Sequence, residues 1–207
     1  MPSAGRGLSL DARRPLSLHP RGEATSRGRR LPGHGGGEGA GYDAEAEAVF
    51  EKALAVREDP TNLTNLGVIR AARGRTNEGI PLLARALEID PDYGNALWSL
   101  ARIRFEERNP VAAESLLRHL LSIEPGRTEA LRLLGRCLLA TDRPAEAIPH
   151  LRAATERSSG DSPLGTDLGV ALARAGKVDE ARVALRKACD LDPENRIARN
   201  LRESLGD

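Results

Sequence analysis

The chain has 207 residues, and its 31 Lys and Arg residues almost balance its 30 Asp and Glu residues, giving a formal net charge of +1 at pH 7. Because the charges balance, the net charge indicates neither a nucleic-acid partner nor a membrane surface. Aromatic residues make up only 2% of the sequence, and no run approaches the ~20 apolar residues of a membrane-spanning helix.

Residues 1–41 differ in composition from the rest. They hold ten of the 21 glycines, four prolines and seven arginines, without sustained apolar periodicity. Such a segment cannot bury enough apolar surface to offset its ordering entropy, so we expect a disordered tail. Three alternatives stay open: an Arg-rich arm that binds nucleic acid or an anionic surface, a transit peptide, or a mis-assigned start near Tyr42.

The tail has positive charge but no apolar segment of the kind that secretory signals contain. A cytoplasmic protein is therefore the default expectation. The abundance of Ala, Gly and Arg suggests a GC-rich, bacterial genome.

Residues 42–59 are the first predicted helical element. Ala46, Phe50 and Ala53 recur at helical spacing and predict one apolar face over residues 43–57. No matching first helix precedes this one, because the tail occupies its place. We expect residues 42–59 to form half of a helical hairpin.

From residue 60 onward the chain repeats with a period of 34 residues. Four rows, residues 60–93, 94–127, 128–161 and 162–195, align without an insertion. Leucine recurs at position 7 as Leu66, Leu100, Leu134 and Leu168, and at position 24 as Leu83, Leu117, Leu151 and Leu185. Small residues recur at position 8 as Gly67, Ala101, Gly135 and Gly169, and at position 20 as Gly79, Ala113, Ala147 and Ala181.

This spacing predicts two helices per row. Positions 4, 7, 8 and 11 share one helical stripe, and positions 20, 24, 27 and 28 share another. Small residues at positions 8 and 20 allow the two helices to approach closely. Pro91, Pro125 and Pro193, at position 32 of three rows, end the second helices, because proline lacks an N–H and disfavours helix in the preceding residue.

The fourth row departs from the pattern. Gly165 stands at position 4, where the other rows have leucine, so we expect the loosest packing there. The preceding junction has Ser159 in place of proline. Residues 196–207 follow as an amphipathic helix with a polar outer face, which is typical of the cap that repeat arrays need for solubility.

The pattern of small residues at positions 8, 20 and 27, with proline at 32, resembles the tetratricopeptide repeat over residues 60–195. The resemblance implies an all-α, right-handed solenoid of helical hairpins. It would have four full repeats, an N-terminal half-repeat and a C-terminal capping helix.

In such repeats the first helices line the concave face, through positions 2, 5, 9, 12 and 13. The resemblance therefore implies a partner-binding groove, and the candidate residues are Trp98, Arg102, Phe105, Arg132, Arg136 and Leu139. Aromatic anchors beside arginines suit a protein or peptide that presents an apolar residue flanked by acids. In the alternative interpretation, Trp98 packs between repeats and the arginines are only solvated. The family's carboxylate clamp does not carry over, since Thr64 and Val68 occupy its positions.

Catalytic, metal and cofactor sites are not expected. His34 is followed by three glycines, as in hydrolase oxyanion loops, but no GxSxG nucleophile motif occurs. His119 and His150 lack the spacing of a metal pair. We interpret the chain as a non-enzymatic adaptor for another protein, with no membrane or nucleic-acid partner. The alternatives are an anion binder acting through residues 1–41 and a scaffolding fragment of a larger enzyme.

Overall fold

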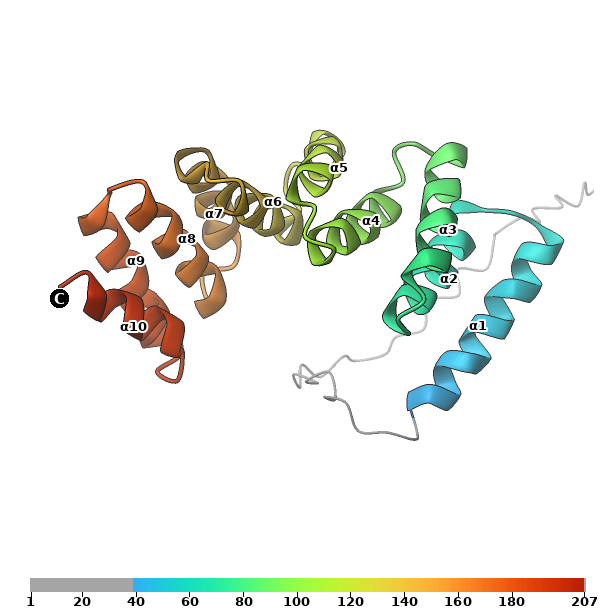
Figure 1. Cartoon of the computed structure of the whole chain (residues 1–207), viewed down its shortest axis with the longest axis horizontal. Helices are drawn as coiled ribbons and strands as arrows, with labels where there is room; N and C mark the ends of the chain where they lie inside the picture. The colour runs from blue at the N-terminus through green and yellow to red at the C-terminus, as the bar shows by residue number, and fades with distance from the viewer. Residues whose placement is uncertain (1–38, 207) are drawn as a thin grey trace, which may run out of the picture. The chain divides into compact units, whose positions relative to one another are not determined.

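The structure is a computed structural model that describes residues 39–206. Within that range the chain forms α-helices and no strand (Figure 1), which confirms the all-α fold class. The tail expected over residues 1–41 lies outside the described residues except at its end. There α1 (Gly39–Val56) begins three residues before Tyr42.

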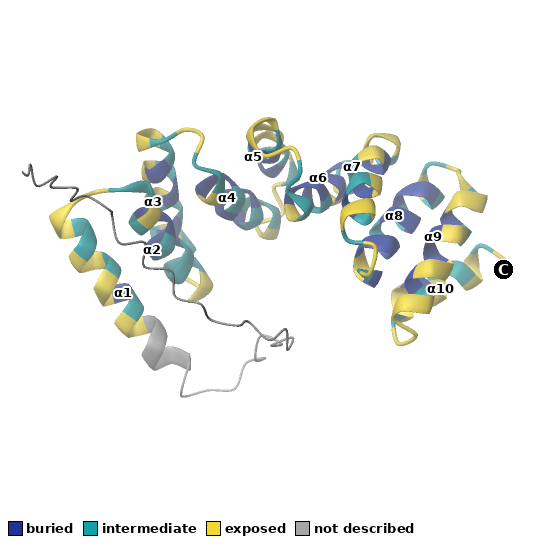
Figure 2. Cartoon of the chain, turned by 180° about the vertical axis from the view of Figure 1, so that it is seen from behind, coloured by how far each residue is buried: buried dark blue, intermediate teal, exposed yellow. Residues whose placement is uncertain are grey.

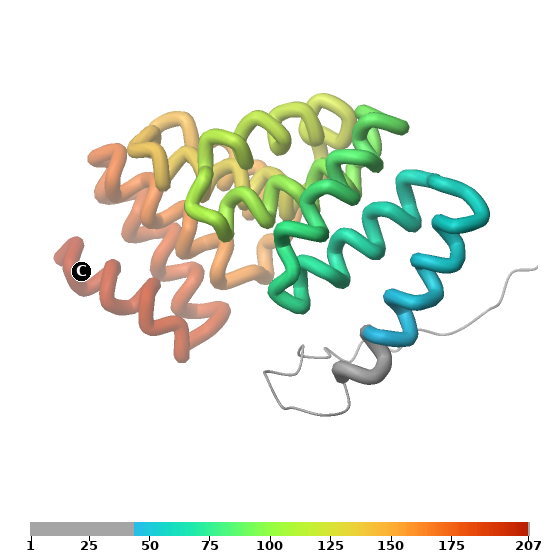
Figure 3. Tube along the Cα trace, turned by 45° about the vertical axis from the view of Figure 1, so that its right-hand side comes forward, coloured from blue at the N-terminus to red at the C-terminus, as the bar shows by residue number. Residues whose placement is uncertain are grey.

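Each 34-residue row contains two helices. The first helices are α2 (Pro60–Ala72), α4 (Gly94–Glu106), α6 (Thr128–Ala140) and α8 (Ser162–Arg174). The second helices are α3 (Thr76–Ile89), α5 (Pro110–Ile123), α7 (Pro144–Arg157) and α9 (Val178–Leu191). A shorter helix, α10 (Arg196–Ser204), follows the last row. The helices succeed one another along the array in chain order (Figure 3).

The packing between rows is asymmetric. Each first helix contacts the first helix of the next row, from α2 to α4 and so on to α10. Among the described helices, no Cα atom of one second helix lies within 8 Å of a Cα atom of another second helix, and only long side chains bridge them. The first helices therefore lie closer together than the second helices, which makes the first-helix side the inner, concave face.

The buried core follows the repeat positions (Figure 2). The four leucines of position 24 are all completely buried, and the four small residues of position 20 are buried as well. Gly67 and Gly79 show why small residues are needed: a Cβ added at Gly79 would lie 2.5 Å from the carbonyl oxygen of Gly67. This close approach joins α2 to α3.

The turn between first and second helices has the same backbone geometry in every row. Position 15 has positive φ: 77° at Gly74, 62° at Arg108, 58° at Asp142 and 78° at Gly176. Glycine adopts this left-handed conformation without steric cost, whereas other residues do so with strain. Two rows therefore carry a strained residue where the other two have glycine.

The loose packing expected at Gly165 does not extend to its α9 side, although the same residue also lines an opening between α7 and α9. Gly165 is buried, and an added Cβ would lie 3.2 Å from the Cβ of Ala188. Because no side chain separates them, α8 and α9 approach closely at this point.

No described helix has both the length and the apolar character to cross a membrane.

Candidate partner-binding face

Trp98 lines a hollow at the N-terminal end of the inner face. The hollow has a volume of about 360 Å³ and combines Trp98 of α4 with Phe50 of α1 and Val68 of α2. Trp98 is half-buried, and the guanidinium of Arg127 lies 5.7 Å from the centre of its ring. A cation at this distance is attracted to the ring face and holds the indole in place.

Thr64 contributes an unsatisfied polar atom to the same hollow. Its side chain is only 3% exposed, and its Oγ1 has no hydrogen-bond partner within the described chain. Buried polar atoms almost always have a partner from protein or water. The Thr64 hydroxyl therefore has a hydrogen-bonding capacity that no described residue uses.

A second hollow surrounds Phe105 and Arg136 at the other end of α4. It has a volume of about 530 Å³ and is completed by Arg108, Pro110 and Ala140. The guanidinium of Arg136, on the neighbouring helix α6, lies 5.0 Å from the centre of the Phe105 ring. Apolar atoms thus form the floor of this hollow, and cations surround it.

The charges around Phe105 are not neutralised internally. Most arginines in the described part of the chain have a carboxylate partner, but none is found there for Arg108 or Arg136. Glu106 also lines this hollow, 3.7 Å from the Arg102 guanidinium. The hollow therefore has two available guanidinium groups against one weakly paired acid, which favours an anionic group.

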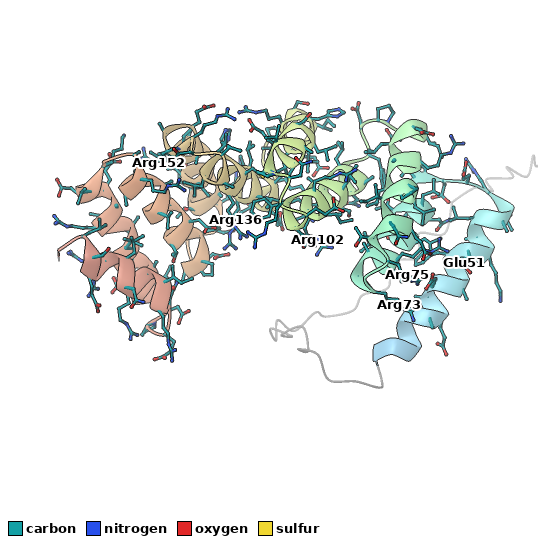
Figure 4. The ribbon with its side chains drawn as sticks, viewed as in Figure 1. Glu51, Arg73, Arg75, Arg102, Arg136 and Arg152 are labelled. Atoms are coloured by element: carbon teal, nitrogen blue, oxygen red, sulfur yellow. The ribbon has the colours of Figure 1, made fainter. Side chains whose placement is uncertain are left out.

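The structure places the six predicted groove residues differently from one another. Trp98 and Phe105 line separate hollows, so they do not form one aromatic anchor. Arg132 donates to Asp167 at 2.7 Å, and Leu139 is only 8% exposed within the core. Arg102 and Arg136, labelled in Figure 4, occupy the same repeat position on adjacent helices. These two and Phe105 remain accessible to a partner.

Phe50, Arg108 and Arg127 were missed by sequence reasoning. The register places Phe50 at a core position, but no first helix precedes α1 in the described chain to cover it. Arg127 precedes α6, outside the positions that line the groove in related repeats. Only Arg108 carries a readable signal, since it stands at the position that is glycine in rows one and four.

Other chemistry is sparse within residues 39–206. No group of three or more His, Cys, Asp or Glu side chains that could hold a metal ion is found there. Burial raises the pKa of the Cys137 thiol to about 12, so this cysteine is protonated and unreactive near neutral pH.

Comparison with known proteins identifies the family. The tetratricopeptide repeat family matches three overlapping segments, residues 70–137, 104–148 and 138–205. These segments cover more than half of the chain, so the chain belongs to the tetratricopeptide repeat family. Proteins with this fold generally mediate protein–protein interactions.

Solved structures show the same fold at low sequence identity. YrrB, a TPR protein with an unusual peptide-binding site, superposes with a TM-score of 0.72 at 22% identity, covering 77% of this chain and 82% of YrrB. A crystal structure of MamA superposes with a TM-score of 0.68 at 20% identity, covering 75% of this chain and 92% of MamA.

Two curated relatives are much longer proteins. Human protein O-mannosyl-transferase TMTC1 is 24% identical over 158 residues, 74% of this chain and 18% of that protein. Cellulose synthase operon protein C of Pseudomonas fluorescens (strain SBW25) is 30% identical over 130 residues, 59% of this chain and 10% of that protein. The chain spans less than a fifth of either relative.

Proposed function

We propose that this chain is a non-catalytic adaptor that binds a segment of another protein along its inner face. The segment would place an acidic side chain between Arg108 and Arg136, against the Phe105 ring. An apolar or aromatic residue would enter the hollow of Trp98 and Phe50. The observation that carries the proposal is the pair of guanidinium groups at Phe105, which have no carboxylate partner in the described part of the chain.

The position of Arg108 agrees with this proposal. The turn has a left-handed backbone at this position in every row, and in the second row it carries an arginine instead of the glycine of rows one and four. Arg108 adopts this conformation with φ of 62° beside the hollow. The similarity to YrrB agrees with a peptide as the bound species.

The experiment compares the binding partners that four forms of the protein recover. Three forms are full-length: the wild type, Phe105→Ala/Arg136→Glu and the control Arg57→Glu. The fourth form is truncated and starts at Tyr42. Arg57 is exposed and lies outside both hollows, so its charge reversal matches the chemistry of the test. Circular dichroism checks that each form keeps its helical content.

We expect the partner to be lost only with Phe105→Ala/Arg136→Glu. Retention by that folded variant would contradict the inner-face site. Loss only with the form starting at Tyr42 would instead assign binding to residues 1–41, and binding would then fall steeply with salt if the ligand were a nucleic acid.

A further inference from the structure

The outer face carries an apolar groove where the third and fourth rows meet. It lies between α7 and α9 over a floor formed by α8, and its volume is about 540 Å³. Leu168 and Leu172 lie in its floor, and Val183 and Leu191 lie in its α9 wall. Val183 is 54% exposed and Leu191 is 48% exposed, so the groove opens to solvent. Its volume lies within the range of ligand-binding clefts.

The repeat register explains why a groove exists at this junction. Three repeat positions line the space between successive second helices. They are position 28 of one row and positions 4 and 23 of the next row. At the first junction they are Leu87, Leu97 and Leu116, and at the second they are Leu121, Leu131 and His150. At the third junction they are Thr155, Gly165 and Ala184, and all three line the groove.

Every one of these positions is smaller at the third junction than at the other two. At the first junction Leu87 and Leu116 pack against the core clusters that contain Leu97 and Leu100. The chain therefore fills this space with its own aliphatic side chains at one junction and leaves it open at another. Compared with the first junction, the third junction lacks two or three branched aliphatic side chains.

The rim of the groove carries both signs of charge. Arg152, labelled in Figure 4, donates to Glu180 at 2.8 Å and joins α7 to α9. Glu156 and Lys187 also line the groove, and no ion pair with a described residue is found for either. Asp161 is occupied in capping the Leu164 N–H at 3.0 Å. An occupant would complement this rim with a base facing Glu156 and an acid facing Lys187.

The length of the groove suits a helix. On α9 its lining runs from Glu180 to Leu191, a separation of eleven residues that corresponds to about 16 Å of helix axis. Aliphatic residues at i, i+4 and i+7 of a bound helix span about 10 Å, so three anchors would fit along the groove.

We propose that this groove is a second docking site, which takes an amphipathic helix of a partner protein through leucine-like side chains. These side chains would occupy the space that Leu87, Leu97 and Leu116 line at the first junction. The site is on the outer face and does not depend on the inner-face site proposed above.

The probe is a short synthetic peptide designed as an amphipathic helix. It has leucines on one face and flanking Glu and Lys residues, and a matched peptide has asparagine in place of leucine. Binding to the full-length chain is measured by NMR titration, which also locates the affected amides. The test variant is Thr155→Leu/Ala184→Leu, which restores the residues of the first junction. Val183→Glu changes only the exposed lip, and Val111→Glu, 67% exposed on α5, is its control.

We expect the leucine peptide to bind at least about tenfold more tightly than the asparagine peptide. Shifts should be confined to α7, α8 and α9. Binding should weaken about tenfold or more in Thr155→Leu/Ala184→Leu and in Val183→Glu, and stay unchanged in Val111→Glu and in Phe105→Ala/Arg136→Glu. The proposal is overturned by any one of three results: no saturable binding up to about 1 mM, shifts elsewhere in the array, or undiminished binding by the folded Val183→Glu variant.

Discussion

The carboxylate of Glu47 on α1 accepts a hydrogen bond from Nε of Arg70 on α2 at a distance of 3.1 Å. Arg73 and Arg75 donate to the other carboxylate oxygen of Glu47, so three guanidinium groups surround one nearly buried acid. In Figure 4, Arg73 and Arg75 lie on the side of the array next to α1, the helix that carries the labelled Glu51. This cluster ties the half-repeat to the first full repeat.

Replacing Glu47 with Gln should release α1 without unfolding the array. The amide cannot neutralise three cations, so only Glu51 and Glu78, which are more exposed, still offset their mutual repulsion. We expect faster hydrogen exchange along α1 and unchanged protection from α4 to α9. Glu45→Gln, on an exposed part of the same helix, is the matched control. Equal exchange in the wild type and Glu47→Gln would show that α1 is held by its apolar contacts alone.

The same cluster predicts a pH dependence. The hydrogen bond from Arg75 is the main cause that lowers the pKa of Glu47, from 4.5 to about 2. Because the folded-state pKa is lowered, the stabilisation is complete above pH 4.5 and is lost as the pH falls toward 2. Protection of α1 amides, measured across this window, should decline in the wild type and change less in Glu47→Gln.

Arg108→Gly should make the protein more stable and a poorer binder. Glycine removes the left-handed strain, at the cost of a more flexible unfolded chain, so we expect a gain of about 1 kcal/mol. For a chain of this size the melting temperature would rise by about 2–4 °C. Asp142→Gly should gain less, because Asp142 also accepts from Arg174 at 2.8 Å. A lower melting temperature for Arg108→Gly would mean that the side chain stabilises the turn.

Gly79→Ala tests the close approach of α2 and α3. Helix propensity alone favours alanine by about 1 kcal/mol, whereas the carbonyl oxygen of Gly67 lies in the path of the new methyl group. We expect crowding to dominate and destabilise the protein by about 1–3 kcal/mol in chemical denaturation. Gly160→Ala is the control, because nothing lies within 4 Å of a Cβ added there. A more stable Gly79→Ala variant would rule out the tight contact.

The two cysteines should react at different rates. Cys137 is completely buried and its pKa is raised to about 12, whereas Cys189 is only half-buried. A thiol reagent at mildly alkaline pH should label Cys189 first, and Cys137 only after denaturant unfolds α6. Labelling of Cys137 at the same rate as Cys189 would indicate that the middle of the array opens readily.

The fold could be predicted because the period of 34 residues repeats the same physical constraint four times. The first row alone places Gly67 and Leu83 in the core. The other rows have equivalent residues at the same positions, which fixes the register of the helices. The helix ends also carry local signals: Asp59 caps α2 by accepting from the N–H groups of Thr61 and Asn62. Such constraints are local in sequence or repeat in register.

The candidate site was harder to predict, because it depends on which side chains meet between rows. Trp98 and Phe105 are seven residues apart on one helix, yet they face different neighbours. Arg132 and Arg136 looked equivalent in sequence, but only Arg132 finds a carboxylate, that of Asp167 one row further on. Pairings of this kind depend on how the helices of adjacent rows are shifted relative to one another. A single sequence does not reveal that shift.

The sparse filling beside Thr155, Gly165 and Ala184 has a mechanical consequence. In a solenoid each row contacts only its neighbours, so the bend of the array is the sum of the deformations at its junctions. The least stiff junction therefore deforms most. Bending of the array should therefore concentrate between α7 and α9, where the Arg152–Glu180 ion pair spans the gap. Raising the ionic strength weakens exposed ion pairs, so salt would loosen this junction more than the first junction, where Leu87, Leu97 and Leu116 fill the space.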